Sequence, residues 1–387
     1  MAALHCGIKR NAAREDLTLV VSDFPCAAAG VYTTNLVFAA PVVWDRAHTP
    51  GDNIRAVIIN SGNANACTGE QGNRDCRQMA AIAGKAAGAD ADQALVLSTG
   101  IIGEFMPLEK IVAGVAELSG RLESDENALE AAARGMMTTD TVPKIASRTI
   151  CVGAHSIQIT GMCKGAAMIG PNMATMLGLV LTDAKIPAAQ LQEMLSEIVE
   201  DTFNCISVDG HMSTNDTVLL LANGAAENHP LQGEDLEHFR TALHHVCAQL
   251  ARKIPEDGEG ATHLITIEIS GCATRQAARA IACAVGNSPL VKTAVAGADP
   301  NWGRIVSAAG YAGVPFDPAG VDLRVNGHLL YERGAPVKFD GGQVSDAIRN
   351  SRDTLVELTF REGDAKIRFW TTDLTADYVR LNADYHT

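Results

Sequence analysis

Short apolar runs of strand length recur along this chain, and segments with helical periodicity lie between the later ones. The runs are "DLTLVVSD", "AAGVYTTN", "RAVIINSG" and "QALVLSTG", and two of the helical segments are "NRDCRQMAAIAGKAAG" and "LEKIVAGVAELSG". This alternation predicts a mixed α/β fold. The 387 residues are too many for one ordinary hydrophobic core, so we expect two domains.

The sequence changes character near residue 285. Beyond "DPNWGRI" it is rich in strand and turn patterns, as in "GVPFDPAGVDLRVNGHLLYERGAPVKF". We therefore expect a large layered α/β domain over 1–284 and a smaller α+β domain over 285–387. Local patterns further predict a hairpin over 148–161, one helix over 274–297, and a hairpin made of "DTLVELTF" and "AKIRFWTTDLT".

Charge and cysteine usage exclude several classes of protein. The net charge is −14 and no run of Lys or Arg occurs, which argues against a nucleic-acid partner. No segment reaches the roughly 18–20 apolar residues of a membrane span, and the N-terminus has no secretory pattern, so we expect a soluble protein. The ten cysteines form no C-x-x-C pair, which predicts free thiols in the cytoplasm and no metal site.

The usual signatures of cofactor enzymes and of common hydrolases are missing from the sequence. It contains no G-x-x-x-x-G-K-[ST], G-x-S-x-G, H-E-x-x-H or G-x-G-x-x-G motif. We therefore expect no cofactor. The eleven histidines are dispersed, and we assign none of them to catalysis.

The motif "GPNMATML" at 170–177 runs directly into the apolar segment "GLVLTD". A threonine at the start of a strand is usually structural, because its branched side chain suits a sheet. The other interpretation is that the Thr175 hydroxyl attacks the Ala174 carbonyl and the chain breaks between them. The freed α-amine, with a pKa of about 7.7–8.0, would then be the base for its own hydroxyl. The residue type alone leaves both interpretations open.

Such a nucleophile requires donors for an oxyanion. The segment "VLSTGIIG" at 96–103 ends a buried run with Thr99 and Gly100. The glycine permits a sharp turn that can direct the Thr99 hydroxyl and the Gly100 N–H at one point. A turn with no catalytic role is the alternative for this motif.

Eight motifs taken together are similar to one known family. They are "VIINSGNANACTG", "STGIIG", "MMTTDT", "KGAAMIGPNMATML", "NCISVDGHMSTNDT", "DGEGAT", "NSPLVKTAVAGADPNWGRI" and "YVRLNADYHT". In this order, from about residue 7 to the last residue, the chain resembles the ornithine acetyltransferase family of arginine biosynthesis.

The resemblance implies a layered αββα-type sandwich of the self-cleaving threonine-nucleophile kind. It implies cleavage into an α chain, 1–174, and a β chain, 175–387, assembled as a heterotetramer of two of each. It also implies acetyl transfer from N-acetylornithine to glutamate through an acetyl-threonine, and leaves open whether acetyl-CoA is a further donor.

The resemblance also assigns roles to single residues. Thr175 matches the nucleophile, and Thr99 and Gly100 match the pair that stabilises the oxyanion. Either Thr139 or its neighbour Thr138 matches a substrate-binding position, and Thr139 is the one assigned. The remaining substrate-binding positions match Lys164, Thr175, Glu259, Asn382 and Thr387.

Two other functions are kept as alternatives. The first is an amidase or aminopeptidase with the same threonine nucleophile, which would pass the acyl group to water. The second is an uncleaved amino-acid-binding protein in which Thr175 is only a strand residue.

Overall fold

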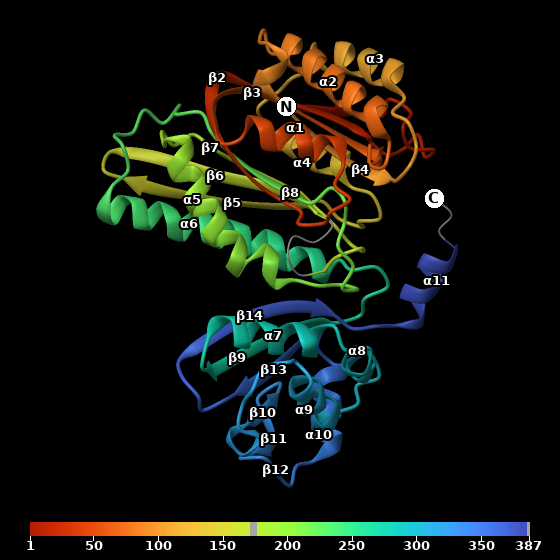
Figure 1. The fold of residues 1–387 in the computed structure, drawn as a ribbon, viewed down its shortest axis with the longest axis vertical. Helices are drawn as coiled ribbons and strands as arrows, with labels where there is room; N and C mark the ends of the chain where they lie inside the picture. The colour runs from red at the N-terminus through yellow and green to blue at the C-terminus, as the bar shows by residue number, and fades with distance from the viewer. Residues whose placement is uncertain (171–175, 385–387) are drawn as a thin grey trace. The chain divides into compact units, whose positions relative to one another are not determined.

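The fold is taken from a computed structural model, which describes residues 1–170 and 176–384 (Figure 1). The chain forms two compact units. The first contains residues 1–165, 176–203 and 212–250, and the second contains residues 166–170, 204–211 and 251–384. Residue 284 lies within a helix of the second unit, and the division at 284/285 stays a prediction. No helix in these ranges is both long and apolar enough to cross a membrane.

The first unit contains an eight-stranded sheet with the order β4-β3-β2-β8-β7-β6-β5, and β1 pairs separately with β2. The strand β2 is long and pairs with two neighbouring strands. Its first residues pair with β3, and Ala27 to Tyr32 pair with β8. The strand β7 lies between β8 and β6. The strands are β1 (Ala2–Leu4), β2 (Leu17–Tyr32), β3 (Gly51–Asn63), β4 (Ala94–Ile101), β5 (Lys144–Val152), β6 (His155–Lys164), β7 (Leu177–Thr182) and β8 (Thr217–Ala222).

Apolar side chains that alternate along the strands of the first unit point to opposite faces of the sheet and form two layers of hydrophobic core. In β3, Ile58 packs against the side of α2 and α3, whereas its neighbours Val57 and Ile59 pack against Leu179 of β7 and Leu219 of β8. The two halves of the sheet therefore face each other, with α2 and α3 outside one half and α5 and α6 along the other (Figure 1). This confirms the predicted layered αββα-type α/β sandwich. The helices are α1 (Ala40–His48), α2 (Gly69–Ala86), α3 (Leu108–Leu118), α4 (Glu126–Met136), α5 (Ala188–Asp201) and α6 (Gly233–Glu256).

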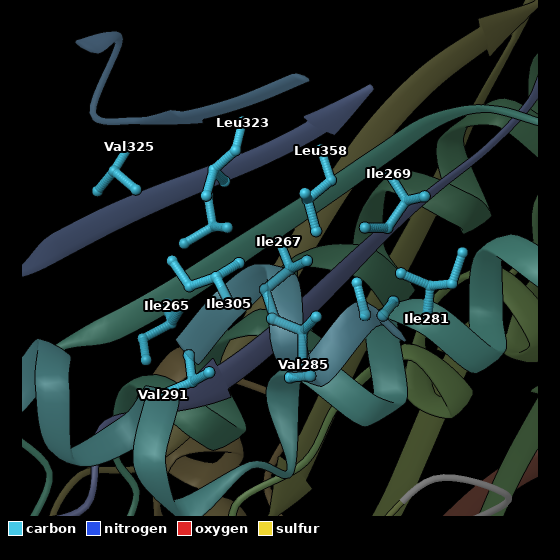
Figure 2. Close-up of a cluster of buried hydrophobic side chains, with 14 of the residues drawn as sticks. Ile265, Ile267, Ile269, Ile281, Val285, Val291, Ile305, Leu323, Val325 and Leu358 are labelled. Atoms are coloured by element: carbon cyan, nitrogen blue, oxygen red, sulfur yellow. The ribbon is translucent and has the colours of Figure 1, made fainter. Parts of the chain in front are cut away.

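The second unit is built on a six-stranded sheet with the order β12-β11-β10-β13-β9-β14. Figure 2 shows its core, in which Ile265, Ile267 and Ile269 of β9 pack with Ile281 and Val285 of α7. Its strands are β9 (Leu264–Cys272), β10 (Asp322–Val325), β11 (His328–Glu332), β12 (Ala335–Pro336), β13 (Asp353–Thr359) and β14 (Ala365–Thr372). Its helices are α7 (Arg275–Gly286), α8 (Pro289–Ala296), α9 (Trp302–Gly310), α10 (Gly341–Arg349) and α11 (Ala376–Asp384).

Of the three local predictions, one is confirmed and two are wrong. The hairpin over 148–161 is present as β5 and β6. The expected single helix over 274–297 is two helices, because Pro289 has no N–H to continue the first and the Ser288 hydroxyl caps the second by accepting from the Val291 N–H. The strands β13 and β14 do not form a hairpin, since β9 lies between them and pairs with both.

Candidate active site

The strands β3 and β4 run parallel and end together, with Ser61 opposite Thr99 and Gly62 opposite Gly100. Gly100 has a φ of 133°, and a Cβ on it would lie 2.2 Å from the Gly62 carbonyl carbon. Only glycine fits this close approach of two backbones. The approach holds this end of β4, so Thr99 and Gly100 lie in a strand and not in the predicted sharp turn; Thr99 is 5% exposed.

We expect Gly100→Ala to lower the free energy of unfolding by about 1–3 kcal/mol, because the backbone there is strained for any other residue and the added carbon meets main-chain atoms. Gly103→Ala is the matched control: it also has a positive φ, of 87°, but no atom lies within 4 Å of its Cβ position. Urea unfolding of both variants measures the difference. Equal losses would show that the contact with Gly62 is unimportant.

Lys164 ends β6 and is 3% exposed. Its Nζ lies 3.3 Å from Oγ1 of Thr99, so the structure brings together two predicted site residues that are 65 positions apart in the sequence. Lys164 also pairs with Leu177, the first residue of β7. The buried cation therefore lies beside both the candidate oxyanion residues at the end of β4 and the strand that follows the "ATM" motif.

Asp140 is a buried acid that the sequence analysis missed. Its Oδ1 accepts from Lys144 Nζ at 2.7 Å and from the Gly165 N–H at 2.7 Å, and its Oδ2 accepts from the Thr138 N–H at 3.0 Å. Burial alone would raise the pKa of Asp140, but the charges of Lys144 and Lys164 together with these hydrogen bonds lower it to about 2. It is therefore an ionised carboxylate that anchors the region around Lys164.

A third lysine adds to this buried positive charge. Burial lowers the pKa of Lys9 to about 8; the charges of Asp16 and Asp140 oppose this shift, and the charge of Lys164 adds to it. Asp16 and Asp140 offset part of this positive charge, and the lysines can still stabilise a bound carboxylate or a developing oxyanion. The only sequence signal for Asp140 was its place in "TTDT", and nothing in the sequence indicated Lys144.

Three of the remaining predicted residues lie outside the described ranges. Thr139 is half-buried in the turn between α4 and β5, next to Asp140. Ala174 and Thr175 lie outside the described residues, as does Thr387. Met176, the residue after Thr175, is described and 1% exposed.

Two predicted substrate-binding residues meet in the second unit. The Asn382 side chain donates from Nδ2 to Oε2 of Glu259 at 2.8 Å, and the Glu259 N–H donates to the Ala166 carbonyl at 2.9 Å. Asn382 lies in α11 and Glu259 lies in the turn before β9. A half-buried carboxylate beside a carboxamide can bind an ammonium group.

A buried ammonium beside a threonine hydroxyl at a strand end, next to a glycine of positive φ, is compatible with an enzyme that transfers or hydrolyses acyl groups. The comparisons with known proteins agree with this class. The ArgJ family model matches residues 1–387. The chain therefore belongs to the ArgJ family.

Two named relatives cover all or nearly all of the chain. The "Arginine biosynthesis bifunctional protein ArgJ" of Rhodopirellula baltica is 43% identical over 389 residues, which is 100% of this chain and 95% of the relative. The protein of the same name from Symbiobacterium thermophilum is 46% identical over 383 residues, 98% of this chain and 94% of the relative. A crystal structure of the Bacillus halodurans "Arginine biosynthesis bifunctional protein argJ" is 40% identical, with a TM-score of 0.52, and covers 52% of this chain and 96% of the solved chain.

Proposed function

We propose that this protein cleaves itself before Thr175 and then transfers acetyl groups from N-acetylornithine to glutamate, forming ornithine and N-acetylglutamate. The observation that carries the proposal is the buried contact of Lys164 with Thr99, next to Gly100 at the end of β4. Membership of a family whose relatives are named for arginine biosynthesis supports the substrate class.

Self-cleavage begins when the Thr175 hydroxyl adds to the Ala174 carbonyl. The hydroxyl proton passes to the Thr175 nitrogen as the peptide bond breaks, which leaves an ester at Oγ and a free α-amine. Water then hydrolyses the ester, giving the Ala174 carboxylate and restoring the hydroxyl. One residue thus supplies both the nucleophile and its base.

Transfer uses the same hydroxyl. The α-amine takes the hydroxyl proton as Oγ attacks the acetyl carbonyl, and the oxyanion accepts hydrogen bonds from the Thr99 hydroxyl and the Gly100 N–H, each worth roughly 3 kcal/mol. The amine returns the proton to the nitrogen of the departing ornithine, leaving acetyl-threonine. The glutamate amine then attacks this ester, and Thr175 leaves with a proton.

The length of the solved relative supports cleavage. The curated relatives are about as long as this chain, but the Bacillus halodurans crystal chain matches only 52% of it while being 96% covered. That share is about 201 of the 387 residues, which exceeds the 174 residues before the proposed break and is close to the 213 after it. A solved chain of this length is expected of one cleavage product.

Intact mass spectrometry after incubation with N-acetylornithine tests the proposal. We expect a fragment that begins at Thr175 and is heavier by one acetyl group. Ornithine release should depend on glutamate, whereas release to water alone would favour the amidase or aminopeptidase alternative. A single uncleaved chain would favour the binding-protein alternative.

We expect Glu259→Gln to raise KM for N-acetylornithine about tenfold and to change kcat little, because the acid contributes the same binding energy to ground and transition states. Glu268→Gln is the control, since Glu268 is another surface acid of the second unit and pairs only with Arg368 among the described contacts. Steady-state kinetics with each substrate measure the effect. An unchanged KM would remove Glu259 from the binding site.

The name "bifunctional" of the relatives supports a second donor, and we propose acetyl-CoA for it. The mass measurement with acetyl-CoA in place of N-acetylornithine tests this directly. No other cofactor enters the proposed mechanism. An assembly of two α and two β chains in the cytoplasm remains part of the proposal, and size-exclusion chromatography with light scattering tests the assembly.

A further inference from the structure

A polar turn just before β8 holds two different segments of the proposed site. The Asn215 side chain donates from Nδ2 to the carbonyl oxygens of Ala64 and Ser98, at 2.7 and 2.8 Å. The next residue, Asp216, accepts at Oδ1 from the Met176 N–H at 3.0 Å. Ser98 precedes Thr99, and Met176 follows Thr175. Two adjacent side chains therefore hold the neighbours of the proposed oxyanion donor and of the proposed nucleophile.

Burial and main-chain hydrogen bonds fix the positions of Asp216 and Met176. Asp216 is 0% exposed, and its main-chain oxygen accepts from the Thr33 N–H at 2.8 Å. The Met176 carbonyl in turn accepts from the N–H of Thr217 at 3.1 Å. Both main-chain polar groups of Met176 are thus bonded to the strand start at 216–217, which fixes the direction in which the chain enters β7.

The second carboxyl oxygen of Asp216 is buried and has no hydrogen-bond partner among the described residues. An ionised carboxylate in such a place would be costly, whereas a protonated one needs less solvation. Burial raises the pKa of Asp216 well above its ordinary value, and the Met176 N–H, the charge of Lys164 and the polar groups of Thr33 and Ser213 offset this only in part. The neutral acid, with one oxygen accepting from Met176, is the form that fits the site.

We propose that Asp216 is a positioning residue: as a neutral acid it holds the Met176 amide, next in sequence to the proposed nucleophile, while Asn215 holds Ser98, next to Thr99. This inference rests on the proposed function. It assigns to the pair 215–216 the task of setting the separation between the attacking hydroxyl and the oxyanion donors, on which the rate depends steeply.

The test compares Asp216→Ala and Asp216→Asn. Alanine removes the acceptor for the Met176 N–H, and we expect slower self-cleavage and a fall in kcat of about 10²-fold with KM unchanged. Asparagine keeps a carbonyl acceptor and presents a neutral donor in place of the acid O–H. We therefore expect Asp216→Asn to cleave and transfer close to the wild-type rate, with an unchanged pH profile.

Asp45→Ala is the matched control. Asp45 is also buried, accepts from a strand N–H, that of Val96 at 2.9 Å, and has an Oδ2 without a partner among the described residues. The Asp45→Ala variant should lose thermal stability, as Asp216→Ala does, but keep the wild-type kcat. If Asp216→Ala fails to fold, the cleavage and transfer rates of Asp216→Asn still test the proposal.

Two results would overturn the inference while the wild type cleaves and transfers normally. One is an Asp216→Ala variant as active as the wild type. The other is an Asp216→Asn variant as impaired as Asp216→Ala, which would require an ionised carboxylate. A wild type that neither cleaves nor transfers acetyl groups would instead refute the proposed function.

Discussion

Replacing Thr175 by alanine is expected to leave a single chain of 40.7 kDa and to reduce acetyl transfer about 10⁴-fold or more. The variant lacks the hydroxyl that would attack the Ala174 carbonyl, so no α-amine is freed and no acetyl-enzyme forms. A denaturing gel measures cleavage, and ornithine release measures transfer.

Thr175→Ser is the control for this substitution, because it keeps a hydroxyl at the same position. We expect it to cleave and transfer, more slowly than the wild type. An alanine variant that still splits before residue 175 and still transfers acetyl groups would refute the mechanism at its first step.

Replacing Asp140 by alanine is expected to lower the free energy of unfolding by about 3–5 kcal/mol, because it leaves the buried ammonium of Lys144 without its carboxylate. Urea unfolding measures this loss. Glu130→Ala is the control, since Glu130 pairs with Arg134 on an exposed helix face and should contribute only about 0.3–0.5 kcal/mol. Similar small losses in both variants would show that the Asp140 pair is not a buried anchor.

The same acid gives a pH dependence with a defined sign. The pKa of Asp140 is about 2 in the folded protein, below its ordinary value of 3.8. Its stabilising contribution is therefore complete above about pH 4 and is lost as the pH falls toward 2. The difference in unfolding free energy between wild type and Asp140→Asn should shrink over this window.

Patterns that depend on neighbouring residues were predictable from the sequence. The hairpin of β5 and β6 was predicted from two strand patterns joined by a short turn, and the mixed α/β fold from the alternation of apolar runs and helices, whereas the order of layers came only from the family resemblance. The failure at β13 and β14 has a physical cause. The segment that separates them, β9, is distant in the sequence, and only its pairing with both strands excludes the hairpin.

The candidate site was predictable only in part. The resemblance placed Thr99, Lys164, Glu259 and Asn382, and the contacts Thr99–Lys164 and Glu259–Asn382 agree with a shared use of each pair. Asp140 and Asp216 were missed because an acid in a polar motif is usually exposed. Their burial depends on strands that pair across the sheet, which residue type does not indicate.

The strand order has a consequence for the two products of cleavage. The strands β7 and β8 follow the proposed break, and they are inserted between β2 and β6, which precede it. Hydrogen bonds along β2–β8 and β6–β7 would join the products on both sides. The two products would therefore remain associated in native buffer and would separate only in denaturant.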